Sequence, residues 1–150
     1  MLLNTKHFGN IEIDEKNVIS FSEGMPGFEE VKKFILLGGT EENYPFQWLQ
    51  AVDDAELAFV VVDPKVFKPD YIIDVEDGEV ETLNIGNTEN IVVLSIVVIP
   101  DDITRITANL KAPILINTEN NKGKQVILNN SEYNIKHYII EELHRIGGRK

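Results

Sequence analysis

The sequence predicts a mainly β fold, a single-domain, compact, barrel-like β fold with one or two short helices. The apolar residues occur in short runs rich in Val, Ile and Phe, bounded by polar or Gly/Pro segments. The 150 residues, of which 43% are apolar and 26% charged, match one ordinary globular domain. Because no linker or composition shift divides the chain, we expect one domain over residues 1–146 and a disordered tail at 147–150.

Short apolar runs with strand composition follow one another along the chain. They lie at residues 18–21, 34–37, 46–52, 57–62, 91–99, 113–116 and 125–128, and residues 11–13 alternate as in a half-buried strand. The runs at 57–62 and 91–99 do not alternate, which is typical of strands covered on both faces. The length of the run at 91–99 would also suit a buried helix, but Val and Ile dominate it and Pro100 ends it. These runs therefore favour a barrel or a layered β fold.

Turn and helix signals complete the expected architecture. Pro and two glycines within residues 24–27 predict a tight loop, and Gly123 between two lysines predicts a hairpin turn. Helix signals are weak and are confined to residues 79–85 and 134–146, where apolar residues recur at near-helical spacing.

The charge is strongly acidic and unevenly placed. Twenty-five acids against 14 bases give a net charge of −11, which argues against generic nucleic-acid binding because that needs a basic face. Residues 1–100 carry −13 and residues 101–150 carry +2. The most acidic stretch, residues 70–81, contains six acids and no base. It is either a solvated face or a docking surface for a basic partner, and net charge alone does not choose between them.

Several classes of chemistry lack the residues they need. The absence of Cys excludes thiol catalysis, thiolate zinc sites and iron–sulfur clusters, and it fits a reducing cytoplasm. No nucleophile-elbow, P-loop or dinucleotide-binding motif is present. The N-terminal residues do not read as a signal peptide, and the longest apolar run has nine residues, whereas a membrane helix needs about 20. We therefore expect a cytoplasmic protein without a membrane segment.

A few polar residues are weak candidates for a catalytic or metal site. His137, Glu141 and His144 have helical spacing that could supply three zinc ligands, or they form an exposed polar face. The pairs Asp53-Asp54 and Asp101-Asp102 each follow an apolar run. Such pairs either cap loops or, if they face each other across a pocket, perform acid/base chemistry.

Two aromatic residues are candidates for core packing or for partner contact. Trp48 is the only tryptophan, and it is either a core residue or an exposed anchor. Phe28 follows the turn at 24–27 and is either a lid over the core or an anchor.

Five motifs in order carry a family resemblance. They are Gly-Met-Pro-Gly-Phe-Glu at 24–29, Pro-Phe-Gln-Trp-Leu-Gln-Ala-Val-Asp-Asp at 45–54, Leu-Ala-Phe-Val-Val-Val-Asp-Pro at 57–64, Thr-Ala-Asn-Leu-Lys-Ala-Pro-Ile-Leu-Ile-Asn at 107–117 and Gly-Lys-Gln-Val-Ile-Leu at 123–128. From about residue 1 to 143, this order and spacing resembles the family of the flagellar assembly factor FliW. Met25 and Ala51 depart mildly from the residues common in that family.

The resemblance implies a small non-enzymatic protein with a barrel-like β fold. Members of that family bind flagellin in the bacterial cytoplasm, and they bind the carbon storage regulator CsrA, an RNA-binding dimer that represses translation of flagellin message. Bound flagellin leaves CsrA free to repress, and export of flagellin releases the factor to capture CsrA. An acidic chain suits a basic RNA-binding partner. It would either cover the RNA site or act allosterically from elsewhere on CsrA, while the near-neutral C-terminal third would suit flagellin.

The resemblance also points to residues in the matching motifs. We expect protein-binding roles for six of them: Phe28, Gln47, Asp53, Asp54, Asn109 and Gln125. For each of these residues, the alternative is a role in the fold, namely capping a turn or pairing strands. We expect no catalytic residue, cofactor, metal, direct nucleic-acid contact or membrane contact, and a monomer when alone. The alternatives are a small-ligand-binding β-barrel and a metal-dependent hydrolase.

Overall fold

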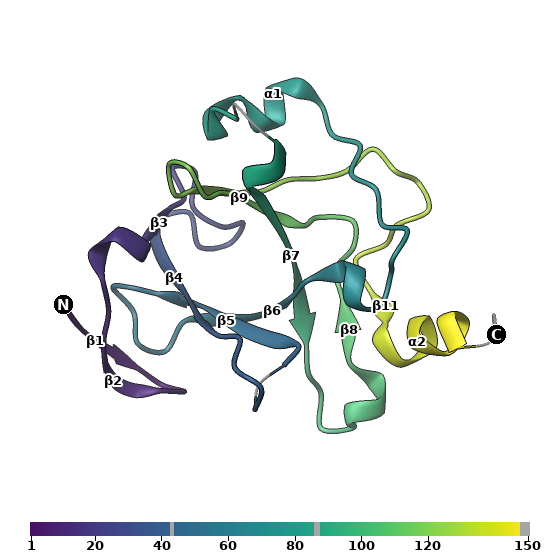
Figure 1. Ribbon diagram of the computed structural model, residues 1–150, viewed down its shortest axis with the longest axis horizontal. Helices are drawn as coiled ribbons and strands as arrows, with labels where there is room; N and C mark the ends of the chain where they lie inside the picture. Colours follow the sequence, from purple (N-terminus) through teal and green to yellow (C-terminus); the bar gives the residue numbers. More distant parts are fainter. Residues whose placement is uncertain (43, 86–87, 148–150) are drawn as a thin grey trace.

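The computed structural model describes residues 1–42, 44–85 and 88–147, which form a mainly β fold with two short α-helices (Figure 1). This confirms the predicted fold class. The strands are β1 Leu2–Thr5, β2 Gly9–Glu12, β3 Ile19–Ser20, β4 Lys33–Gly38, β5 Phe46–Ala51, β6 Ala58–Val62, β7 Ile91–Val98, β8 Thr107–Ala108, β9 Ile114–Asn117, β10 Lys122–Gln125 and β11 His137–Tyr138. The helices are α1 Asp77–Val80 and α2 Ile139–Gly147.

Seven of the strands close into a barrel. Their order is β7, β6, β5, β4, β3, β10 and β9, and β9 pairs back onto β7 to complete the ring. Neighbouring strands in the ring are antiparallel except for β10 and β3, which are parallel. Strands β8 and β11 extend the sheet beyond β7, and β1 and β2 form a separate hairpin beside the barrel (Figure 1).

Both faces of the barrel wall are covered, which explains the continuous apolar runs. In β4, Phe34 and Leu36 point into the barrel, while Ile35 and Leu37 pack against the β1–β2 hairpin. In β7, Val92, Leu94 and Ile96 belong to the interior, whereas Ile91, Val93 and Val97 belong to a second core outside the wall. A strand with two buried faces has no polar face, so the runs at 57–62 and 91–99 could not alternate.

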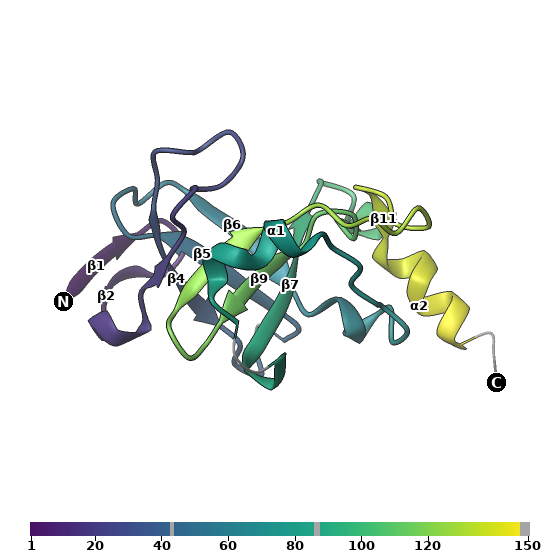
Figure 2. The same cartoon turned by 90° about the horizontal axis from the view of Figure 1, so that it is seen from above.

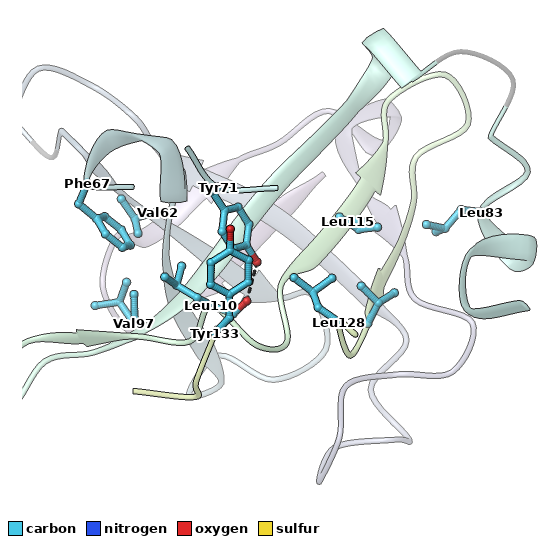
Figure 3. Packing of buried hydrophobic residues seen from close by; sticks show 11 residues of the cluster. Val62, Phe67, Tyr71, Leu83, Val97, Leu110, Leu115, Leu128 and Tyr133 are labelled. Atoms are coloured by element: carbon cyan, nitrogen blue, oxygen red, sulfur yellow. Dashed lines mark hydrogen bonds between the residues drawn. The ribbon is translucent and has the colours of Figure 1, made fainter. Parts of the chain in front are cut away.

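The second core lies between the outer face of the barrel and the segments that follow β6 and β10 (Figure 3). Tyr71 is its central polar member. Its hydroxyl donates a 2.6 Å hydrogen bond to the Leu110 carbonyl, and its ring lies 4.7 Å from the ring of Tyr133, centroid to centroid. Burial, with a smaller contribution from charge repulsion by Tyr133, raises the pKa of Tyr71 well above its ordinary value.

We expect Tyr71→Phe to change how stability depends on pH. Because the folded pKa of Tyr71 is raised, its proton stabilises the fold fully below pH about 10, and that contribution falls as pH rises toward the folded pKa. The variant should lose about 1–2 kcal/mol at pH 7, since the Leu110 carbonyl loses its donor. As the pH rises above 10, the free energy of unfolding of the variant should fall less than that of the wild type. Urea unfolding of both proteins between pH 7 and 11 measures this, and parallel curves would contradict it.

Two sequence expectations near the C-terminal third are corrected. The strand predicted at 125–128 lies instead at Lys122–Gln125, and Gly123 stands inside it, opposite Ile116, rather than in a turn. The turn comes earlier, where Asn121 adopts a positive φ of 53°. Asparagine tolerates that conformation, so the turn needs no glycine.

The two helices are shorter than predicted. Around residues 79–85, α1 spans Asp77–Val80 and a 3-10 turn follows at Glu81–Leu83, which ends at Asn84 with a φ of 49°. In place of a helix from 134 to 146, His137–Tyr138 pair with β8 as strand β11, and α2 begins only at Ile139. Of the tail predicted at 147–150, Gly147 is the last residue of α2, and residues 148–150 lie outside the described residues.

Candidate functional site

The six residues predicted to bind a partner lie on several separate elements. Phe28 lies in the loop after β3, Gln47 on β5 and Asp53 and Asp54 between β5 and β6. The other two, Asn109 and Gln125, follow β8 and end β10 respectively. Because they occupy separate elements, their positions alone do not define a single site.

Three of these side chains hold the local backbone. Asp54 accepts from the Glu56 amide at 3.0 Å, and Gln125 donates to the Ala112 carbonyl at 3.0 Å. Asn109 accepts from the amides of Lys111 and Ala112 at 3.1 and 3.0 Å. This is the turn-capping chemistry typical of Asp and Asn.

The other three present more accessible surface. Phe28 is 43% exposed and leans edge-on against Phe59, with ring centroids 5.7 Å apart. Asp53 is exposed, and Gln47 is half-buried with its amide over Gly39. Phe28 therefore combines a fixed ring with a free face, the geometry of an aromatic anchor.

Trp48 is half-buried beneath the end of the β1–β2 hairpin. Its ring meets Phe8 edge-on at 5.3 Å and His7 at 6.2 Å, centroid to centroid. Trp48 therefore packs the hairpin against β5.

Six acidic residues and no basic residue lie within residues 70–81, named here the acidic segment. Tyr71, Ile73 and Val75 point into the second core, so Asp70, Ile72, Asp74 and Glu76 point outward. This period of two is present in the sequence and is typical of extended backbone, which here runs outside the named strands. This alternation is missed when only the charges of the segment are considered.

Hydrogen bonds fix the acidic segment against the chain after β10. The Ile72 amide donates to the Tyr133 hydroxyl at 2.9 Å, and the Asp74 amide donates to Asn130 Oδ1 at 3.0 Å. The Asn129 amide donates to the Asp74 carbonyl at 2.7 Å. The carboxylates therefore stand on a backbone held in one conformation, which leads into α1 (Figure 2).

Ion pairs involve two carboxylates of the acidic segment. Asp70 lies 3.5 Å from the Lys68 ammonium, and Glu79 lies 3.5 Å from Lys124. Burial of Lys124 would lower its pKa, but hydrogen bonding to Glu23 and the charges of Glu23 and Glu79 outweigh burial and raise it. Within the described ranges, no lysine or arginine pairs with the exposed residues Asp74, Glu76 and Asp77. The centre of the segment is therefore an uncompensated negative surface.

Of the three candidate metal ligands near the C-terminus, Glu141 and His144 are exposed on α2, and His137 is bonded within the chain. Nε2 of His137 accepts from the Asn134 amide at 2.8 Å, and its Nδ1 lies 3.2 Å from Glu142. Glu142 is only 3% exposed and also accepts from Arg145, so it anchors α2. Across residues 1–42, 44–85 and 88–147, no three His, Asp or Glu side chains form a group that could hold a metal ion. Among the residues that the structure describes, no helix has both the length and the apolar composition of a membrane span.

Comparisons with known proteins cover nearly the whole chain. A family model described as FliW protein matches residues 2–139. Flagellar assembly factor FliW of Thermoanaerobacter pseudethanolicus is 52% identical over 95% of both chains, and that of Treponema denticola is 40% identical over 98% of this chain and 99% of its own. A crystal structure of the flagellar assembly factor FliW matches with a TM-score of 0.85 and 41% identity, covering 93% of this chain and 96% of that one. The chain therefore belongs to the FliW family of flagellar assembly factors.

Proposed function

We propose that this protein binds flagellin in the cytoplasm and, when flagellin is absent, binds CsrA and relieves its repression of flagellin synthesis. It acts by binding and performs no catalysis. Membership in the FliW family supports the role in flagellar assembly. The observation that carries the choice of a basic regulator is the negative surface of the acidic segment, whose central carboxylates lack cationic partners in the described part of the chain.

An RNA-binding regulator carries basic surfaces because phosphate contacts dominate its affinity for RNA. A fixed cluster of exposed carboxylates attracts such a surface and raises the association rate. The acidic segment is well suited to this role, since its backbone is held by Tyr133, Asn130 and Asn129. Little ordering is then required when the partner arrives.

We assign flagellin to a less polar surface that begins just before the near-neutral residues 101–150 and extends into them. Val98, Ile99 and Ile103 are exposed around the connection from β7 to β8, and Leu143 is exposed on α2. Exposed apolar side chains of this kind occur at protein–protein contacts. Two separate surfaces would allow the partners to exclude each other through overlap of their bulk or through a change in conformation.

Titration calorimetry with flagellin and CsrA from the same organism tests the proposal. Each partner is titrated alone, and flagellin is then titrated into the preformed complex with CsrA. We expect both to bind and flagellin to displace CsrA. Binding to neither would overturn the proposal, and binding to both without competition would overturn the exchange between them.

Neutralising the acidic segment should slow the association with CsrA. The variant replaces Asp74 and Asp77 with Asn and Glu76 and Glu79 with Gln, which removes the long-range attraction. We expect an association rate at least about tenfold lower at 50 mM salt, and a smaller difference at 500 mM, where charges are screened over a few ångströms. Stopped-flow or biosensor kinetics measure this rate.

A matched variant controls for net charge in that experiment. It neutralises four exposed acids elsewhere, Glu30, Glu41, Glu42 and Asp101. We expect it to retain most of the wild-type rate because the charges it removes lie outside the acidic segment. Equal losses in the two variants would assign the effect to total charge and remove the segment from the interface.

A further inference from the structure

A cleft of about 400 Å³ opens where the barrel wall is least complete. Strand β3 has only two residues, so the segment from Glu12 to Asn17 runs past this part of the wall, beside the end of β4. The floor of the cleft consists of apolar side chains from the barrel interior: Ile19, Leu36, Val92 and Ile116. A partner bound at the surface can therefore contact apolar side chains of the core through this cleft.

Four polar side chains on the rim are bonded within the chain. Asp14 accepts from the Lys16 amide at 2.9 Å, and Thr118 donates to the Asn90 carbonyl at 2.9 Å. Asn121 donates to the Lys16 carbonyl, and Glu12 accepts from the Met1 ammonium at 2.7 Å. Small-molecule sites orient a ligand with a few convergent polar groups. These four rim groups serve the fold instead, so the cleft favours an apolar insertion over a polar ligand.

The surroundings of the cleft are acidic. Glu12, Asp14 and Glu15 lie along one short segment that carries a single base, Lys16. On the other side of this segment, a second cleft of about 400 Å³ is lined by residues that include Glu15, Val18, Lys33 and Asp53. A peptide segment bound along this surface lies beside the carboxylates of Asp14, Glu15 and Asp53. Basic residues on that segment are complementary to these charges.

We propose that the cleft receives an apolar side chain from a protein partner, carried on a segment with Lys or Arg beside it. The apolar side chain contacts Leu36, Val92 and Ile116, and the basic residues contact Asp14 and Glu15. The inference rests on the proposed function only in requiring a protein partner, and it concerns a surface separate in sequence from the acidic segment. Such an apolar anchor in a desolvated pocket with a charged rim is the usual form of an interface hot spot.

The test fills the cleft and compares it with the same substitution at an exposed aliphatic residue outside it. Val92 is half-buried in the cleft, whereas Ile127, which follows β10 and does not line the cleft, is 66% exposed. We expect Val92→Phe to weaken the binding of flagellin or of CsrA at least about tenfold by calorimetry, and Ile127→Phe to leave the binding of that same partner within about twofold. Asp14→Asn keeps the capping oxygen and should weaken that binding about threefold at low salt only.

The outcomes separate this inference from the proposed function. Wild-type binding that Val92→Phe does not weaken, or that Val92→Phe and Ile127→Phe weaken equally, would overturn the cleft as a site and leave the proposed function standing. If the wild type binds neither partner, the proposed function fails, and the cleft is tested with short peptides instead. Thermal unfolding verifies that each variant is folded, and Asp14→Asn and the peptides carry the test if Val92→Phe is not.

The peptide test uses methyl NMR of the wild-type protein. The probes are acetyl-Lys-Lys-Leu-Lys-Lys-amide, the same peptide with Ser in place of Leu, and the same peptide with Glu in place of Lys. We expect the methyl resonances of Leu36 and Val92 to shift with the first probe only. Equal shifts with all three probes, or shifts with benzene but with none of the peptides, would show that the cleft does not select a basic, apolar segment.

Discussion

Replacing Phe21 with alanine should lower the free energy of unfolding by about 3–5 kcal/mol, the range for deleting a buried aromatic side chain. Phe21 is 0% exposed at the centre of the barrel. Its ring meets Phe34 edge-on, with centroids 5.2 Å apart, and it covers Gly123 of β10. The cavity left by the substitution would lie between strands of the closed ring, where the wall cannot collapse easily. Urea unfolding at pH 7 measures the loss.

Gly123 supplies a stringent check on this packing. A Cβ at position 123 would lie 2.6 to 3.0 Å from three ring atoms of Phe21, too close for real atoms. Gly123→Ala alone should therefore cost about 1–3 kcal/mol. In the Phe21→Ala background the added methyl enters the cavity, so its cost should vanish or change sign. A double-mutant cycle with strictly additive costs would contradict the contact.

Replacing Gln50 with methionine should cost about 2–4 kcal/mol, because it removes the donor for one buried and several partly buried carbonyls. Gln50 is 0% exposed. Its amide nitrogen donates to the carbonyls of Ala51, Asp54 and Leu57 at 3.1, 3.0 and 3.1 Å. One side chain thus ties together the loop that presents Asp53 and Asp54. Urea unfolding gives the cost, and hydrogen exchange at the amide of Leu57, which donates to the Asp54 carbonyl, reports the loosening of the loop.

Gln50→Glu is the isosteric comparison. Its carboxylate would face the same carbonyl oxygens without a donor, so it should be less stable than the methionine variant at pH 7 and recover as the carboxyl is protonated at lower pH. Wild-type stability in the methionine variant would show that water satisfies these carbonyls. It would also remove Gln50 as the residue that holds the loop.

The barrel was predictable because its strands leave a strong local signal. The run from Ile91 to Val98 is apolar on both faces, and a strand in a closed wall with two cores requires that composition. The position of Gly123 was not predictable in this way. Glycine after a polar stretch usually marks a turn, but here its missing side chain makes room for Phe21, a residue far away in the sequence.

The candidate site was less accessible to sequence reasoning for a related reason. Asn109 and Gln125 stand in matching motifs, yet their side chains bond the backbone near Ala112, so the motif alone does not separate folding from binding. The acidic segment was visible as charge, but its exposure depends on Tyr133 and Asn130, which reach it from a distant part of the chain. The cleft at Val92 combines residues of five strands, β2, β3, β4, β7 and β9, with residues of the loops between them, and no local pattern encodes it.

The closed ring also determines when this protein can fold. Its two closing pairings join β10 to β3, through Lys122 and Ser20, and β9 to β7. Contacts between such distant parts of a chain form slowly, and barrels of this kind fold in milliseconds to seconds. During synthesis, the ring cannot close until β9 and β10 have left the ribosome. Until then the edges of β3 and β7 remain open, and the nascent chain is at its most prone to aggregation.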